Sequence, residues 1–165
     1  GAGEYFLVSQ RGLAAALLEA AESTRPSSPN ENVLGNKAVF TAPQEWTARA
    51  AFERMAAYGV TSLPIVESGG RAVGVISATD VLHGTKDLDL RVREFVALSR
   101  HAAGISREPH CIVKCAPHDG VLDALRLMMH EEVRHVYVLD ASDTPVGVFS
   151  LVDALRTAEL YAAQL

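Results

Sequence analysis

The sequence predicts a mixed α/β protein of the α+β type, with two β-α-β-β-α repeats packed about a pseudo-twofold axis and an extra N-terminal helix. The main observation is that Gly74-Val75-Ile76-Ser77-Ala78-Thr79-Asp80 returns as Gly147-Val148-Phe149-Ser150-Leu151-Val152-Asp153, displaced by 73 positions (147 − 74). The second observation is that each copy follows the same succession of strand, helix, strand and turn. Each unit then has one apolar face that needs cover, and the other unit supplies it.

Composition fits a soluble globular protein of 165 residues, with 48% hydrophobic and 21% charged residues. The net charge of −5 argues against general nucleic-acid binding. No apolar run approaches the roughly 20 residues of a membrane span, and no signal peptide is visible. We therefore expect a cytoplasmic protein that binds neither nucleic acid nor membrane. The chain begins Gly1-Ala2-Gly3 without an initiator methionine, so we expect that its start has been trimmed.

The N-terminal segment, residues 1–37, is expected to hold one helix and a linker. Apolar residues recur at helical spacing between Glu4 and Glu22. Turn formers such as Pro26, Pro29 and Asn30 follow without an apolar period. We expect this helix to cover a dimer face or to dock on the neighbouring repeat.

The first repeat is expected at residues 38–84. Its predicted elements are a strand at Ala38–Thr41, a turn at Ala42-Pro43, a helix at Trp46–Tyr58, strands at Leu63–Glu67 and Ala72–Ile76 joined by a hairpin turn, and a second helix from Ser77. Gly59 is a natural stop for the first helix. The predicted inner face of that helix consists of Trp46, Ala50, Ala51, Met55 and Ala56.

Residues 85–110 are read as a connector and residues 111–165 as the second repeat. Apolar residues from Leu88 to Leu98 predict a short connector helix, followed by a polar stretch from Ser99. The connector's charged residues, Arg100 among them, are interpreted as a solvated surface of mixed sign. The second repeat is expected to contain strands at Cys111–Cys115, His135–Asp140 and Val146–Phe149, and helices at Val121–Glu131 and Ser150–Ala163.

The repeated heptapeptide has two compatible interpretations. Ser77 with Asp80, and Ser150 with Asp153, fit a capping box in which the serine begins a helix and the aspartate lies in its first turn. Alternatively, the same hydroxyl and carboxylate line a cleft and hold the hydroxyls of a sugar, near a helix N-terminus that favours phosphate.

Cysteine and histidine provide no recognisable metal site or catalytic constellation. Cys111 and Cys115 are expected to be buried, unpaired thiols, because four residues of strand span about 13 Å, too far for a disulfide. His130 and His135 are five positions apart, about 140° around a helix, whereas a zinc protease places its histidines four apart. No GxxxxGK[ST] loop or GxSxG elbow occurs. We expect no catalytic residue, no metal and no enzymatic activity.

The double heptapeptide, with its strands and helices, resembles a cystathionine-β-synthase (CBS) domain pair, also called a Bateman module, from about Ala38 to Leu160. Such pairs are regulatory, and many bind adenosyl compounds between the repeats. The resemblance implies that Ser77, Asp80, Ser150 and Asp153 contact ligand oxygens and ribose. It also implies that the backbone at Thr41-Ala42 and Cys115-Ala116 holds adenine.

The second repeat is further similar to the gamma subunit of AMP-activated and related kinases. Cys115-Ala116-Pro117-His118-Asp119 and the stretch from Val133 to Asp140 carry this likeness. It implies that Arg134 and His135 contact phosphates, whereas the equivalent Thr61-Ser62 is neutral, so we expect asymmetric binding that favours the second motif. The complete set of expected ligand-binding residues is Thr41, Ala42, Val60, Thr61, Ser62, Ser77, Asp80, Val113, Cys115, Ala116, Val133, Arg134, His135, Ser150 and Asp153.

The function expected from this resemblance is energy sensing by a regulatory module. AMP, ADP, ATP or another adenosyl compound would be the ligand, with no cofactor required. A homodimer is expected, with a kinase or another regulated protein as a further partner. The alternatives are a ligand-free interaction or dimerisation scaffold, and a regulatory fragment of a larger enzyme or kinase complex.

Overall fold

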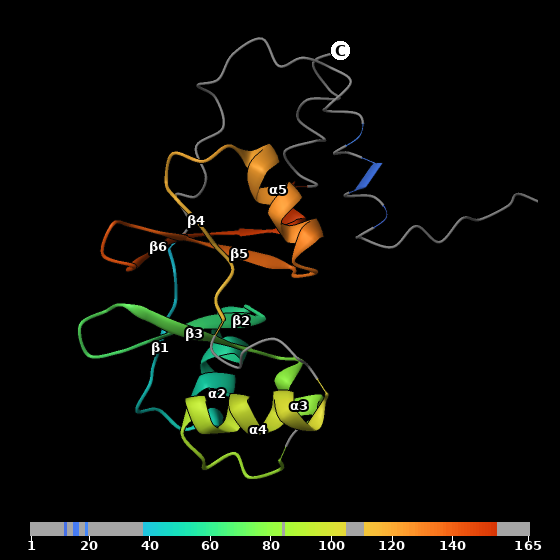
Figure 1. Ribbon diagram of the computed structural model, residues 1–165. Helices are drawn as coiled ribbons and strands as arrows, with labels where there is room; N and C mark the ends of the chain where they lie inside the picture. Colours follow the sequence, from blue (N-terminus) through green and yellow to red (C-terminus); the bar gives the residue numbers. More distant parts are fainter. Residues whose placement is uncertain are drawn as a thin grey trace, which may run out of the picture.

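The computed structural model describes residues 38–83, 85–104 and 111–154, together with Gly12, Ala15, Ala16 and Glu19. Two three-stranded sheets face each other, with α5 on one outer side and α2, α3 and α4 on the other (Figure 1). The four isolated N-terminal positions are helical, but most of the predicted helix at Glu4–Glu22 lies outside the described residues. Within the described part of the chain, no helix has both the length and the apolar character required to span a membrane.

Each sheet is built in the same way, which confirms the predicted fold class. In the first sheet β1 (Ala42–Pro43) pairs in parallel with β2 (Ser62–Val66), which pairs antiparallel with β3 (Ala72–Ser77). The second sheet repeats this order with β4 (Lys114–Cys115), β5 (His135–Leu139) and β6 (Pro145–Ser150). Even the irregularity in the antiparallel register recurs, at Ile65/Val66 and at Val138/Leu139.

The first strand of each repeat lies later than the sequence predicted. Ala38–Thr41 is not a strand, and the predicted turn at Ala42-Pro43 is wrong, because these two residues form β1. Likewise only the last two residues of Cys111–Cys115 are extended as β4. Pro43 is tolerated because β1 is an edge strand, where a missing N–H donor leaves no partner unsatisfied.

Helix α2 (Ala48–Tyr58) has the boundaries that its capping residues dictate. The Thr47 side chain accepts a hydrogen bond from the Ala50 N–H at 3.2 Å, and Gly59 ends the helix with φ 63°. Its buried face contains Ala48, Ala51 and Met55. The predicted inner face was therefore partly wrong: Ala56 is exposed, because an alanine-rich helix offers apolar residues on every side.

Helix α4 (Val92–Ala102) packs into the core of the first repeat. Val92, Phe95 and Val96 are fully buried against the β1-β2-β3 sheet and α2. The helix continues through the stretch that was predicted to be polar from Ser99, and Leu98, predicted on its apolar side, is 45% exposed. The remaining helices are α3 (Asp80–His83) and α5 (Val121–His130); residues 151–154 are helical, and the rest of the predicted closing helix lies outside the described residues.

The facing sides of the two sheets make a small core of their own. Ala72 of β3 packs there with Tyr137 and Leu139 of β5. The Ala72 N–H also donates to the carbonyl oxygen of Asp143, in the β5–β6 turn, at 2.9 Å. The repeats are thus joined both by apolar packing and by a backbone hydrogen bond.

Candidate functional site

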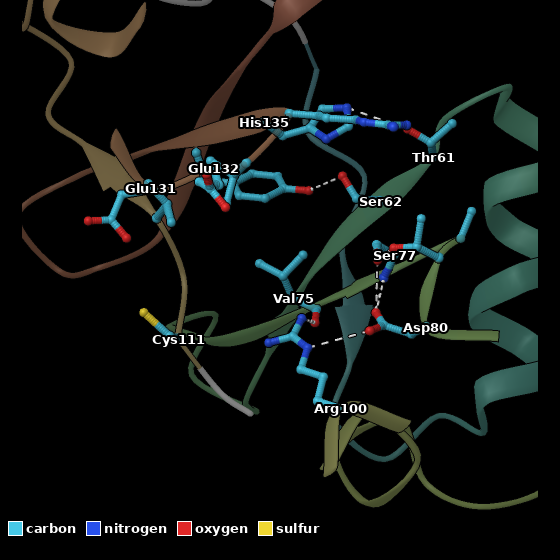
Figure 2. Close-up of a pocket in the computed structure, with 16 residues that line it drawn as sticks. Thr61, Ser62, Val75, Ser77, Asp80, Arg100, Cys111, Glu131, Glu132 and His135 are labelled. Atoms are coloured by element: carbon cyan, nitrogen blue, oxygen red, sulfur yellow. Dashed lines mark hydrogen bonds and ion pairs between the residues drawn. The ribbon is translucent and has the colours of Figure 1, made fainter. Parts of the chain in front are cut away.

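A cleft of about 610 Å³ lies between the repeats, a size typical of small-molecule sites. Both repeats line it, and Figure 2 shows their side chains converging on the same space. The lining residues are Thr61, Ser62, Val75, Ser77, Ala78, Thr79, Asp80, Arg100, Cys111, Val113, Glu131, Glu132, Val133, Arg134, His135 and Tyr137.

The first heptapeptide forms one wall of the cleft. The backbone N–H of Ser77 donates to Asp80 Oδ2 at 2.7 Å, and the Ser77 hydroxyl donates to the same oxygen at 2.9 Å. Asp80 therefore closes the turn between β3 and α3, with 6% of the residue exposed. The capping interpretation is correct for the carboxylate, and the same two side chains line the cleft as the sugar-binding interpretation requires.

Arg100 of α4 lies next to Asp80 in this wall. Its Nη2 donates to the carbonyl oxygen of Val75 at 2.9 Å, and its Nε lies 3.4 Å from Asp80 Oδ1. The Arg100 side chain is 13% exposed, so its interpretation as solvated surface charge is wrong. Packing of α4 on the first repeat turns this part of the helix toward β3, which the charge pattern of the connector alone could not reveal.

The opposite wall comes from the start of β5 and meets the start of β2. His135 Nε2 lies 3.4 Å from Thr61 Oγ1, and Tyr137 Oη shares a hydrogen bond of 2.6 Å with Ser62 Oγ. The neutral pair of the first repeat and the basic pair of the second therefore face the same cleft. Arg134 and His135 consequently lie in the cleft of the first motif, although the sequence assigned their phosphate role to the second motif.

The second heptapeptide forms a complete capping box. Asp153 Oδ2 accepts from the Ser150 hydroxyl at 2.6 Å and from the Ser150 N–H at 3.0 Å, while the Asp153 N–H donates to Ser150 Oγ at 3.3 Å. Burial lowers the pKa of His135, the Asp153 carboxylate acts in the opposite direction, and the Arg134 charge lowers the pKa further. His135 therefore lies within electrostatic reach of the second motif while it lines the cleft of the first.

The predicted ligand-binding residues thus fall into two groups. Those that line the described cleft are Thr61, Ser62, Ser77, Asp80, Val113, Val133, Arg134 and His135. Those that are not among its lining residues are Thr41, Ala42, Val60, Cys115, Ala116, Ser150 and Asp153. The Ala116 N–H, expected to face adenine, donates to Asp119 Oδ2 at 2.7 Å.

Sequence reasoning missed several lining residues besides Arg100. Glu131 and Glu132 border the cleft in the turn after α5, where Glu132 has φ 56°, a left-handed conformation uncommon outside glycine. Glu132 is the second residue after the end of α5, a position where helices often end in a left-handed turn. That position is the signal from which the turn could have been predicted. Tyr137 was not predicted, because the alternation of side chains along β5 does not indicate which face of the strand meets the other repeat.

The two cysteines differ, although both were predicted to be buried. Cys111 is exposed and lines the cleft, whereas Cys115 of β4 is buried in the core of the second repeat; both are free thiols. Burial raises the pKa of the Cys115 thiol to about 11. In the part of the chain that the structure covers, no three histidine, cysteine or acidic side chains gather as metal ligands would.

Comparison with known proteins places the sequence in a family. Residues 33–86 and 107–159 each match the CBS domain. The gamma-3 subunit of 5′-AMP-activated protein kinase from Bos taurus is 28% identical over 109 residues, which cover 63% of this chain and 21% of the subunit. The gamma subunit from Kluyveromyces lactis is 33% identical over 103 residues, 59% of this chain and 30% of that protein. The chain thus spans a fifth to a third of these relatives.

Solved structures agree on the fold. The CBS domain pair of protein MJ0100, solved with 5′-methylthioadenosine and S-adenosyl-L-methionine, superposes with a TM-score of 0.65 at 18% identity, over 82% of this chain and 98% of that one. Protein MJ1225 from Methanocaldococcus jannaschii, described as a putative archaeal homologue of the kinase gamma subunit, gives 0.63 at 20% identity, over 91% of this chain and 53% of that one. With both repeats matched in sequence and in fold, the chain belongs to the CBS domain family as a domain pair.

Proposed function

We propose that this chain is a regulatory module that binds an adenine nucleotide (AMP, ADP or ATP) between its repeats and reports occupancy to a partner or dimer mate. The observation that supports this most directly is the composition of the cleft. Ser77 and Asp80 of one repeat line the same cleft as Arg134 and His135 of the other. A carboxylate beside a basic pair suits a ligand with sugar hydroxyls at one end and phosphate at the other.

The mechanism that we infer is differential affinity. A ligand that contacts both walls stabilises one relative arrangement of the repeats, and a partner that recognises this arrangement then senses occupancy. Charge-assisted hydrogen bonds from an aspartate to ribose hydroxyls contribute about 1.5–3 kcal/mol each. Micromolar affinity, about −8 kcal/mol, is then reached with a few such contacts and suits a sensor that must release its ligand.

The partners are proposed from the relatives. The gamma subunits matched here are parts of a protein kinase by name, so a kinase is a candidate partner for this chain. A homodimer formed through the repeats is the second proposed assembly. Sedimentation equilibrium with and without AMP would distinguish a ligand-dependent dimer from a monomer.

A ligand-free scaffold is the second candidate, and one observation favours it. Each aspartate accepts two hydrogen bonds from the serine of its own motif. The motifs therefore have a structural role whether or not a nucleotide binds. On this alternative, substituting either aspartate changes stability and nothing else.

Calorimetric titration of AMP, ADP, ATP and S-adenosylmethionine into the wild type, Asp80→Asn and Asp153→Asn separates the two candidates. We expect micromolar binding of a nucleotide, weakened by about tenfold or more when the aspartate that holds its ribose loses its charge. Asp123→Asn, on the exposed face of α5, is the matched control and should bind like the wild type. If no adenosyl compound binds the wild type at millimolar concentration, the sensor proposal is wrong and the scaffold remains.

A further inference from the structure

We propose that His135 takes up a proton from solvent when a nucleotide phosphate enters the cleft, so that nucleotide affinity rises as pH falls through the neutral range. His135 would thus make the occupancy of this site depend on pH as well as on nucleotide concentration. The inference rests on the proposed function, because it concerns the phosphate end of the same site.

His135 is held in place where the two repeats meet. Its Cα lies opposite that of Ser150 in the antiparallel β5–β6 pair, and the Leu151 N–H donates to the carbonyl oxygen of Arg134 at 3.1 Å. Its Nε2 lies 3.4 Å from Thr61 Oγ1 of the other repeat, a contact that Figure 2 shows. The imidazole is half-buried and lines the cleft. A ligand in the cleft therefore meets this ring at a position that both repeats fix.

The contact with Thr61 is compatible with either protonation state of the ring. A neutral imidazole has one donor nitrogen and one acceptor nitrogen, whereas the imidazolium has two donors. The threonine hydroxyl both donates and accepts, so it can turn to suit Nε2 with or without a proton. Uptake of a proton therefore requires no rearrangement across the repeats, and the nearby charges decide whether it occurs.

The surroundings of His135 favour the neutral ring in the structure. Burial lowers the pKa of His135 most, the Asp153 carboxylate raises it, and the Arg134 guanidinium lowers it. The other repeat and strand β6 present neutral groups to the ring, Thr61 and Ser150. The remaining charged residues that line the cleft, none of which is among the charges that shift this pKa, are Asp80, Arg100, Glu131 and Glu132. His135 therefore carries little charge at neutral pH.

A nucleotide phosphate reverses this balance. A phosphate monoester carries about −1.5 to −2 charge at pH 7, which attracts the imidazolium directly. It also offsets the repulsion from Arg134, since the guanidinium then faces an anion. Both effects raise the pKa of His135, so binding brings a proton from solvent onto the ring nitrogen that lacked one. By linkage, affinity must increase as pH falls from above the ligand-bound pKa to below the ligand-free pKa.

NMR titration of the histidine side chains tests the proton uptake directly. The chain has six histidines, and the Cε1–H signal of His135 is the one absent from His135→Gln. We expect its midpoint to lie below the ordinary value of about 6.5 in the free protein and to rise by about one pH unit at saturating AMP. Adenosine, which has no phosphate, should leave the midpoint unchanged. The His118 side chain is 88% exposed and is not among those that line the cleft, so its midpoint should move with neither ligand.

Calorimetry of AMP binding between about pH 6.5 and 8 measures the consequence for affinity. At the upper end His135→Gln should bind nearly as well as the wild type, because both side chains are neutral there. At the lower end the wild type should bind several-fold more tightly, within the limit of about tenfold that a shift of one unit allows. The ratio of the two affinities at each pH cancels the protonation of AMP itself, whose phosphate titrates near pH ~6. His118→Gln is the matched control and should follow the wild type at every pH.

The wild type alone decides the question if His135→Gln does not fold, as judged by far-UV circular dichroism. Heats of binding in two buffers with different protonation enthalpies should then show net proton uptake with AMP and none with adenosine. An affinity ratio that does not change with pH, a His135 midpoint that AMP does not raise, or no net uptake would overturn the role of His135 and leave nucleotide binding intact. Absence of binding by any adenosyl compound to the wild type would instead overturn the proposed function, and this inference with it.

Discussion

The hydrogen bond between Ser62 and Tyr137 joins the two repeats at the base of the cleft, and its removal is a direct test of how they are held together. Tyr137 is 2% exposed, and its hydroxyl lies 2.6 Å from Ser62 Oγ. Burial raises the pKa of this phenol well above its usual range, so it is a neutral hydrogen-bonding group at every relevant pH. The Ser62→Ala change leaves that buried hydroxyl without its partner.

The expected loss of stability depends on which hydroxyl group is left without a partner, because a buried unpaired hydroxyl costs more than one that water can reach. Ser62→Ala should lower the free energy of unfolding by about 1–3 kcal/mol, the desolvation penalty of an orphaned buried hydroxyl. Tyr137→Phe should cost less, about 0.5–1.5 kcal/mol, because the half-buried Ser62 can regain water. The double variant should be more stable than the sum of the single changes predicts, with a coupling near 1 kcal/mol.

Urea denaturation of the four proteins of this cycle, followed by circular dichroism, measures the coupling. Unchanged denaturant slopes would show that the variants unfold between the same two states. A coupling indistinguishable from zero would refute the reasoning, because the two side chains would then not share a bond across the repeats in solution.

Three further outcomes can be measured on single variants. Burial lowers the pKa of His135, so as pH falls the unfolded chain takes up this proton before the folded chain does. The free energy of unfolding should therefore decrease as pH drops below about 6.5. In thermal unfolding measured at several pH values, His135→Gln should weaken this dependence. Ellman's reagent should react rapidly with Cys111 and slowly with Cys115, whose pKa is about 11, and Cys111→Ser should abolish the fast phase. Gly59→Ala should destabilise by about 1–2 kcal/mol because φ is 63°, whereas Gly69→Ala, in open space, should be close to neutral by urea denaturation.

The fold was predictable because the same succession of strands and helices occurs twice in the sequence, so each copy supports the assignment of the other. The order of helices and strands, the hairpins and the stop at Gly59 all followed from local residue chemistry. The first strand of each repeat was misplaced because it pairs along only two residues, too few to create a period. Its position is fixed by partners more than 20 residues away, such as Ile65 for Ala42.

The cleft was predictable only in part, for a related reason. Ser77 and Asp80 could be predicted because their motif recurs, and Arg134 and His135 because of their position at the start of a predicted strand. Arg100 lies in the connector, outside the repeated heptapeptide, so neither recurrence nor resemblance could single it out. Its neighbour Ser99 is fully buried, and this shows that the connector helix turns its apparently polar end into the first repeat.

The backbone hydrogen bond from Ala72 to Asp143 bears on which changes evolution can make here. Because the donor is a main-chain N–H, every substitution at position 72 except proline keeps it. Position 143 is more restricted, because its φ of 59° favours glycine, asparagine or aspartate and excludes proline. Hairpin tips usually accept insertions freely. An insertion at the β5–β6 tip would instead move the Asp143 carbonyl away from the first repeat, so selection must preserve the length of this turn as well as a residue at position 143 that tolerates a left-handed backbone.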